Sequence, residues 1–502
     1  MTSRTQWISP APGQPAPASV GGRLPVALLV AATGLSLVAY VLLPPDYRGL
    51  AVLAPIALAV GILGALKPEL ALLGVVLFAP FDNTRFFDAY LPPDLSASKI
   101  LGFLLIGSLV FSIVVLRRRF RFMDDPQDLL VLLFLASIVF SAVASDHTRT
   151  VLGEVDRIVR LVALYFAVKN LATSPRIIFL ILATFFLATV YTALFGIHEV
   201  ATGLELRASG IDDNPNRFAM TSVIAACIGF YLFLSSRRFL LQLLFFAGTA
   251  IIVFGILLAA SRGGLLSLSV VVVIFILRQP KRLQIGVALA IILAFALPVM
   301  PEALRNRVFA PSEGFLNEEE ESAVNSVDRR FDYYLVGMQI VSSHPVIGAG
   351  YRSFRQIFPY SDLAFRNNEL TVSESSRVAH NVYLETLTGT GVLGLTAFLG
   401  MLYVAWRSFR RARSLSPPGS TVWAAASGLE YALIGYMVSS MFISSDQDKY
   451  VWILLGMSSA LLFYARTHAA ASTSPIQPVM PGQPAAEPLW LADQTPGGER
   501  AR

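Results

Sequence analysis

Residues 239–277 read FLLQLLFFAGTAIIVFGILLAASRGGLLSLSVVVVIFIL, and this stretch decides the fold class. Two apolar runs in it are separated by Ser261-Arg262-Gly263-Gly264, and basic residues stand before the first run (237–238) and after the second (278–282). Because the runs are continuous rather than alternating, they predict membrane helices and not barrel strands. The stretch therefore predicts a helical hairpin whose two basic ends lie on the same side of a membrane.

The composition of the whole chain agrees with this hairpin. Of 502 residues, 55% are hydrophobic and 14% are charged, whereas a soluble domain carries about a quarter charged residues. A soluble globular protein is excluded. The net charge is +6, but the basic residues form short clusters beside apolar runs, which indicates membrane topology and not nucleic-acid binding. The single cysteine, Cys227, lies within an apolar run and excludes an intramolecular disulfide.

The fold class predicted for the chain is an all-α polytopic membrane protein with about fourteen transmembrane helices. We expect spans near 24–43, 48–66, 69–80, 98–116, 128–144, 151–171, 175–195, 217–235, 239–260, 264–277, 283–300, 382–408, 421–442 and 449–466. Two of them are weak. The stretch 69–80 is short enough to be re-entrant, and 151–171 contains Glu154, Asp156, Arg157 and Arg160.

Alternation of the spans assigns a side to each loop. With the N-terminus inside, the basic clusters at 117–121, 237–238, 278–282 and 407–413 all fall on the inner face, as the positive-inside rule expects. We therefore expect a multi-pass membrane protein with both termini cytoplasmic. The outer segments are then 81–97, 196–216, the Ser-Arg-Gly-Gly junction and 301–380.

The chain divides accordingly into five parts. Residues 301–380 form an outer loop too long for a simple connector, and a helix-like stretch at 328–343 makes it a candidate lid. The predicted order is a flexible cytoplasmic N-terminus (1–22), transmembrane helices 1–11 (23–300), the periplasmic loop or lid (301–380), helices 12–14 (381–466) and a disordered cytoplasmic tail (467–502).

Two outer segments carry arginines next to turn-forming residues. Residues 207–219 read RASGIDDNPNRFA, and a guanidinium beside a helix start favours anions. In the simpler alternative, Asn216 caps a helix over 217–235 and Arg207 is solvated. At the Ser-Arg-Gly-Gly junction, Arg262 stands at the outer boundary, where a snorkelling side chain at a helix end is the alternative.

Two further motifs follow in the outer loop and after it. The first is His344-Pro-Val-Ile-Gly-Ala-Gly-Tyr351-Arg352-Ser-Phe354, and the second is Ala-His380-Asn381-Val-Tyr-Leu-Glu385. In this order, from Arg207 to about Leu395, the motifs resemble the O-antigen ligase and O-antigen polymerase superfamily of bacterial surface-polysaccharide enzymes.

The resemblance implies a GT-C-like glycosyltransferase architecture, a location in the bacterial inner (cytoplasmic) membrane, and a reaction. It implies transfer of a glycan from an undecaprenyl-diphosphate carrier to a hydroxyl acceptor at the periplasmic face, by a metal-independent inverting enzyme without a cofactor. The implied partners are the lipid-linked glycan, a glycan or lipid A core acceptor, membrane lipid and a chain-length regulator, with no nucleic acid.

Arginines suit the donor side of such a reaction. A diphosphate leaving group needs fixed positive charge in the transition state, and Arg207 and Arg262 can supply it, with Arg352 as a further contact. Arginine grips phosphate bidentately and stays protonated near a membrane, so we expect that lysine will not replace it. Tyr351 and Phe354 offer sugar stacking, although loop packing explains them equally well.

His380 is the residue chosen as general base for the acceptor hydroxyl, because histidine has a suitable unperturbed pKa. A polar helix-entry role is the alternative. Asn381 and Glu385 are expected to support it, and Asn216 to support the arginine loop.

Charges within predicted spans remain to be placed. Arg157 and Arg160 share a helical face and can line the same substrate cavity as the outer arginines. Pairing within the helix, of Glu154 with Arg157 and of Asp156 with Arg160, is slightly favoured over this role. Glu430 lies in a predicted span and is costly unless protonated, paired or facing water.

Three reactions are compatible with the motifs. A polymerase of O-antigen or exopolysaccharide repeat units is preferred because of the high number of predicted spans. The alternatives are an O-antigen ligase that acts on lipid A core and a protein oligosaccharyltransferase. An anion or solute transporter is a further alternative of another class, disfavoured because the sequence shows no convincing internal repeat.

Overall fold

The computed structural model describes residues 67–81, 97–143, 145–212, 214–284, 318–366 and 378–473, together with Gly34, Val38 and Gly64. All regular elements within these ranges are helices, as predicted. The longer ones are α3 (Pro68–Phe78), α4 (Ala97–Val114), α5 (Pro126–Val143), α6 (Thr148–Leu171), α7 (Pro175–Ala201), α8 (Pro215–Ser235), α9 (Phe239–Leu258), α10 (Arg262–Leu277), α13 (Glu318–Ser343), α16 (Val382–Leu415), α17 (Thr421–Ser439) and α18 (Lys449–Thr473).

Several of these helices have the length and apolarity of membrane spans. Among the described residues five qualify, namely α5, α7, α8, α9 and α16, and α4, α10 and the 68–81 segment are shorter apolar helices. An all-α membrane protein is thus confirmed. The predicted spans near 24–43, 48–66 and 283–300 lie almost wholly outside the described residues, so the count of fourteen stays a prediction.

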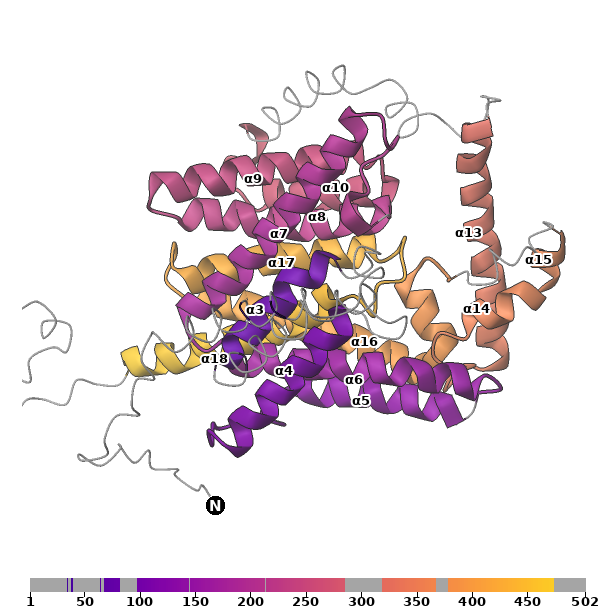
Figure 1. Cartoon of the computed structure of the whole chain (residues 1–502), viewed down its shortest axis with the longest axis horizontal. Coiled ribbons are helices and arrows are strands. Elements are labelled where there is room, and N and C mark those ends of the chain that lie inside the picture. Colours follow the sequence, from indigo (N-terminus) through magenta and orange to yellow (C-terminus); the bar gives the residue numbers. More distant parts are fainter. Residues whose placement is uncertain are drawn as a thin grey trace, which may run out of the picture.

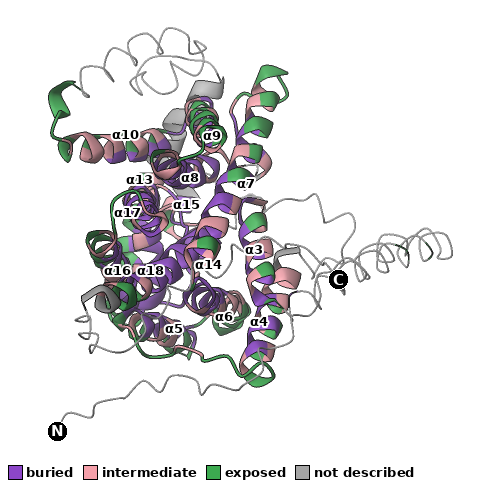
Figure 2. Ribbon diagram, turned by 90° about the vertical axis from the view of Figure 1, so that its left-hand side faces the viewer, coloured by how far each residue is buried: buried purple, intermediate pink, exposed green. Residues whose placement is uncertain are grey.

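The long helices pack into a bundle, and α13 lies across one end of it (Figure 1). Seen from that figure's left-hand side, buried residues fill the interior and exposed ones lie on the outward faces (Figure 2). Contacts between α8 and α17, and between α16 and both α5 and α18, form the centre. Since the outward faces carry large apolar side chains such as Phe140, Leu240 and Phe246, they suit contact with lipid.

Local sequence explains where the helices begin. Ser174, Asn214, Ser261, Asn381 and Ser420 are N-cap residues whose side chains accept backbone N–H groups of the first turn. Such caps satisfy N–H groups that have no partner within the helix. The caps of α7 and α8 are each followed by proline at the first helical position, where its missing N–H costs nothing.

One end of the bundle gathers basic residues around a buried carboxylate. Glu430 in α17 is fully buried and pairs with Arg278 at 2.8 Å and Arg413 at 2.7 Å. Arg278 follows α10, and Arg413 lies in the last turn of α16. Because Glu430 is paired, its burial within the helical bundle is tolerated. The pairing also joins the basic clusters at 278–282 and 407–413, which the predicted topology places on the inner face. We call this the inner end.

The opposite end, here the outer end, joins helix starts. The Ser261 hydroxyl donates to Asn216 Oδ1 at 2.8 Å, which connects the starts of α10 and α8. The Val382 amide donates to the Ser440 carbonyl at 2.9 Å, which connects the start of α16 to the end of α17. The predicted outer junctions therefore lie together, while the side of the membrane that they face stays a prediction.

The outer loop docks on α16 through an interruption in that helix. Gly391 has φ 64° and ψ −166°, which breaks the helical hydrogen-bond ladder. Gly389 accepts from the Gly350 amide at 3.1 Å, and the Val392 amide donates to the Pro345 carbonyl at 2.9 Å. The Gly-Ala-Gly turn of the outer loop thus packs by backbone contact against the interruption of α16.

Replacing Gly391 with alanine is expected to loosen this docking. A Cβ atom there would lie 2.2 Å from the Val346 carbonyl oxygen, and the positive-φ backbone conformation alone costs a non-glycine residue about 1–3 kcal/mol. Gly419 is the matched control, because it has φ 79° but no atom within 4 Å of a Cβ. Thermal unfolding in detergent is expected to show a larger loss of stability for Gly391→Ala than for Gly419→Ala. Equal losses would show that the close approach is unimportant.

The outer loop has a small apolar core of its own. Its buried residues are Tyr333, Val336, Ile340, Ala349, Phe354, Phe358, Ala364, Ala379 and Leu384. The predicted helix at 328–343 is present as α13, which begins earlier, at Glu318. Short helices α14 (Phe354–Ile357), η6 (Phe358–Tyr360) and α15 (Asp362–Arg366) complete the layer.

One predicted boundary is displaced. The disordered tail was expected from residue 467, but α18 continues to Thr473, because its Ala-rich end favours helix.

Candidate functional site

The junction between α9 and α10 carries Arg262 at the outer end. Ser261 caps α10 by accepting the Gly264 amide at 3.2 Å and donates its own hydrogen to Asn216. A Cβ on Gly263 would lie 2.9 Å from Phe442, so glycine permits close packing there. Arg262 itself is exposed. The junction therefore holds the backbone of Arg262 in place and leaves its guanidinium group accessible.

Asn216 differs from its predicted capping role. Asn214 is the cap of α8, its Oδ1 accepting the amides of Asn216 and Arg217 at 3.0 and 3.2 Å. The capping alternative for Asn216 was wrong because Pro215 takes the first helical position and shifts the cap back by two residues. Asn216 instead connects two motifs that are far apart in sequence.

Arg207 is attached to the same junction. Its Nε donates to the Ala259 carbonyl at 2.9 Å and its Nη2 to the Ala260 carbonyl at 3.4 Å. Next to it, the Ala208 amide donates to the Leu258 carbonyl at 3.1 Å. Arg207 therefore helps to fix the loop before α8 against the end of α9, a structural role beside the predicted binding role.

His380 lies in a strained turn at the start of α16. Its φ is 49°, a left-handed conformation that is uncommon for histidine. Glu385 Oε2 accepts the Ala379 amide at 2.8 Å, and Asn381 caps α16 by accepting the amides of Tyr383 and Leu384. The two predicted support residues thus hold the backbone on both sides of His380.

An aromatic ring from the outer loop faces the imidazole. The rings of Tyr333 and His380 are stacked with centroids 5.8 Å apart. Tyr333 belongs to α13, so the lid helix reaches the turn before α16. The contact brings the lid and the candidate base together.

Arg330, one turn before Tyr333, connects this pair with the arginine junction. Burial lowers the pKa of the Arg330 guanidinium below its usual value, and the charge of Arg262 acts in the same direction. The exposed Arg262 and the partly buried Arg330 therefore act on each other electrostatically, and two such cations raise the local positive potential. Arg262, Arg330, Tyr333 and His380 therefore form one neighbourhood at the outer end.

Arg352 lies behind this neighbourhood. Its side chain is 13% exposed and its Nη1 lies 3.5 Å from Asp446, which is fully buried. Burial opposes the charge, but Asp446 and Glu385 outweigh it and raise the pKa of Arg352 above its usual range. The Tyr351 hydroxyl also donates to Asp446, and burial together with that carboxylate raises the tyrosine pKa. This burial favours a supporting role over the expected phosphate contact.

The aromatics beside Arg352 are interior residues. Tyr351 and Phe354 are 0% and 1% exposed, so packing of the loop explains them and sugar stacking does not.

The loop between α17 and α18, residues 440–448, connects nearly all these segments. Asp446 binds Tyr351 and Arg352, Asp448 pairs with Arg217, Ser444 donates to Glu385 at 3.1 Å, and Gln447 donates to Glu154 at 2.8 Å. Residues 443–448 are all buried. Buried polar groups that satisfy one another rigidify a site. We call this segment the hub loop.

The charges of α6 divide between two partners. Arg160 pairs with Asp156 and lies 5.4 Å above the ring of Phe103, as the simpler alternative predicted. Glu154 bonds to Arg355 of the outer loop at 2.8 Å, and not to Arg157. Glu154 therefore pairs with an arginine of the outer loop, whereas the sequence spacing predicted a partner within α6.

The sequence reasoning missed Arg330 and the hub loop. A weak signal existed for the latter, since Ser-Ser-Asp-Gln-Asp-Lys is a dense polar run between two apolar helices. Arg330 had the spacing of a helix face with Tyr333, but nothing local indicated that Arg262 lies opposite.

The arrangement suits reaction of an anionic substrate. Five described non-glycine residues have positive φ, and three of them, Ala260, Arg352 and His380, belong to the outer end, while the other two lie between α4 and α5. Such strain persists only where surrounding structure fixes it, and it concentrates at functional sites. Guanidinium groups can stabilise negative charge, and an imidazole nearby can accept a proton.

Comparison with known families supports the same region. Residues 247–399 match the family model described as O-antigen ligase, which confirms the resemblance found in the motifs. This stretch contains Arg262, Arg330, Arg352 and His380, while Arg207 and the hub loop lie outside it. No curated protein matches the chain. The match indicates a glycan-transfer role in surface polysaccharide synthesis for a bacterial membrane protein.

Proposed function

We propose, from the O-antigen ligase match and the outer-end geometry, that this protein is an inverting, metal-independent glycosyltransferase of the inner membrane. It polymerises repeat units of O-antigen or exopolysaccharide, taking them from undecaprenyl diphosphate at the periplasmic face. The observation that carries the proposal is the neighbourhood of Arg262, Arg330 and His380, in which cations stand close to a candidate base.

On the donor side, Arg262 and Arg330 contact the diphosphate. As the bond from the anomeric carbon to the phosphate oxygen breaks, negative charge develops on the leaving group, and fixed cations stabilise it. Arg207 supports the same site from its position against the α9 carbonyls. The lipid diphosphate leaves with the electron pair of the broken bond.

On the acceptor side, His380 receives the proton of the attacking hydroxyl. The hydroxyl oxygen forms the new bond to the anomeric carbon from the face opposite the diphosphate, which inverts the configuration. Proton transfer by a positioned side chain contributes about 10²–10⁴ to the rate of such a step. The turn held by Glu385 and Asn381 gives the imidazole its position.

A glycan gel separates the polymerase from the ligase. In a deletion strain, surface polysaccharide reduced to a single attached repeat unit supports a polymerase. Complete loss of attached glycan supports ligation to lipid A core or protein instead. Normal long chains in the deletion strain would reject both reactions, and purified protein with the lipid-linked repeat unit provides the direct test.

Replacing Asp446 with asparagine is expected to destabilise the protein by about 3–5 kcal/mol, because it leaves the buried Arg352 charge without its carboxylate partner. Asp362→Asn on the exposed helix α15 is the control. The double variant with Arg352→Gln should recover about 0.5–3 kcal/mol of the summed losses. Unfolding in detergent is measured for wild type, Asp446→Asn, Arg352→Gln, the double variant and the Asp362→Asn control, and strictly additive losses would contradict the pairing.

A further inference from the structure

A groove of about 380 Å³ opens on the outer loop next to the proposed transfer site. It lies between the second half of α13 and the segment of α14 and η6, with the loop before α6 at one side. The described residues that line it include Val336, Gln339 and Ile340 of α13 and, opposite them, Gln356, Ile357 and Tyr360. Nothing in the proposed reaction at His380 uses it.

The lining combines two kinds of side chain. Gln339, Gln356 and Ser343 offer uncharged donors and acceptors, and Ile340 and Ile357 offer apolar surface. Among the described residues that line it, none is a lysine, arginine, aspartate or glutamate, and the two histidines, His147 and His344, are the basic side chains. A phosphate or a nucleic acid would need cationic partners, whereas a neutral saccharide presents hydroxyl groups and apolar ring faces. The chemistry of the groove therefore fits a neutral glycan.

An exposed aromatic ring stands at the edge of the groove. Tyr360 is 82% exposed, although large aromatic side chains usually bury most of their surface. A tyrosine ring can stack on the apolar face of a sugar, and its hydroxyl group can form hydrogen bonds with sugar hydroxyls or with water. Tyr360 thus provides a platform for a sugar ring.

The groove lies further along α13 from the reacting centre. Tyr333 stacks on His380, and Val336 and Ile340 of the groove follow it by three and seven positions on the same helix. At 1.5 Å per residue, these positions lie about 5 and 10 Å along the axis from Tyr333. A glycan whose reacting end is beside His380 therefore reaches the groove within a few bond lengths of chain.

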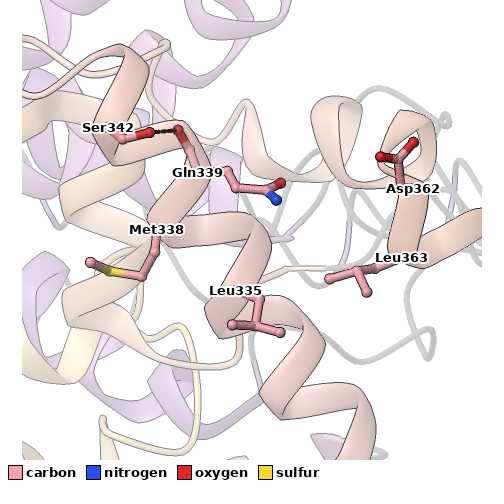
Figure 3. A pocket seen from close by; sticks show the side chains of 6 residues that line it. All are labelled: Leu335, Met338, Gln339, Ser342, Asp362 and Leu363. Carbon is pink, nitrogen blue, oxygen red and sulfur yellow. Dashed lines mark hydrogen bonds between the residues drawn. The ribbon is translucent and has the colours of Figure 1, made fainter.

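A second hollow lies across Gln339 from the first. It has a volume of about 470 Å³, and Figure 3 shows Leu335, Met338, Gln339 and Ser342 of α13 on one side and Asp362 and Leu363 of α15 on the other. Gln339 lines both hollows. A chain that leaves the groove can thus continue over Gln339 on the same surface.

We propose that the groove of α13, α14 and η6 binds the neutral part of the glycan chain, beyond the sugar that reacts. This inference rests on the proposed glycosyltransferase function and deepens it. The groove holds several sugars of the chain during successive transfers, so it sets how long the product becomes.

Direct binding tests the groove. The probes are fragments of one, two and three repeat units, released by mild acid from the host cell's own surface polysaccharide. Tyr360→Ala combined with Gln339→Ala is expected to weaken binding of the longer fragments at least tenfold. Because both side chains are exposed, the double variant should fold normally. Tyr334→Ala is the matched control, because Tyr334 is 51% exposed on the same helix but lines neither hollow.

Product length gives a second measurement. The double variant is expected to make shorter chains at an unchanged rate of first transfer, and Tyr334→Ala is expected to match wild type. Wild-type protein that transfers glycan but binds no fragment, or a double variant with unchanged binding, would overturn the groove. Wild-type protein that binds fragments but transfers nothing would instead reject the proposed function and leave the binding site standing.

Discussion

His380→Ala is expected to lower the rate of glycan transfer by about 10²–10⁴-fold, the usual contribution of a positioned acid or base. The side chain is removed from a turn whose backbone is held by Glu385 and by the Asn381 cap, so the fold should persist. Binding of the lipid-linked donor should remain within a fewfold of wild type, because the arginines are untouched. Initial rates with purified protein and lipid-linked repeat unit measure the first effect, and donor titration the second.

The matched control is His198→Ala. His198 lies near the end of α7 on the exposed outer side and has no part in the proposed site. It should retain wild-type transfer. If His380→Ala also retained transfer within a fewfold, His380 would be no general base, and the polar helix-entry alternative would replace it.

Arg262→Ala is expected to cost about 10²–10³ in the transfer rate, the loss typical of one donor that stabilises developing negative charge. Arg262→Lys should recover little, because an ammonium cannot make the bidentate contact of a guanidinium. The side chain is exposed and the junction is held by Ser261 and the glycines, so neither change should disturb packing. Transfer rates at saturating donor separate this loss from weaker binding.

Arg238→Ala and Arg238→Lys serve as controls for Arg262. Arg238 is an exposed arginine at the other end of the same helical hairpin, next to the inner start of α9. Both variants should transfer normally. Full activity of Arg262→Lys would show that a point charge suffices, and full activity of Arg262→Ala would remove the residue from the site.

Local patterns predicted the parts of the fold that depend on neighbouring residues. The hairpin around Ser261 is visible in the sequence because apolar length and a polar break are both local properties. The helix of the outer loop was also predictable, except for its first turns, since α13 begins at Glu318. The clustering of Arg262 and His380 followed from topology alone, which assigns sides without distances.

Contacts between distant segments were not predictable in the same way. The roles of Arg330 and Asp446 depend on partners far along the chain, Arg262 and Arg352 respectively. The cap of α8 was misplaced because two asparagines flank Pro215, and only tertiary contact showed that Asn216 belongs to Ser261. Tertiary packing therefore determines which asparagine caps α8 and which charged residues pair, and the local sequence does not distinguish these alternatives.

The hub loop has a consequence for biogenesis. Residues 440–448 follow every other segment of the proposed site in the chain, and synthesis proceeds from the N-terminus. While the ribosome is still making α17, the partners of Asp446 and Asp448 have been translated but their carboxylates have not. The outer end can therefore reach its final arrangement only when the last helical pair has been inserted, so a nascent or truncated chain has no assembled site.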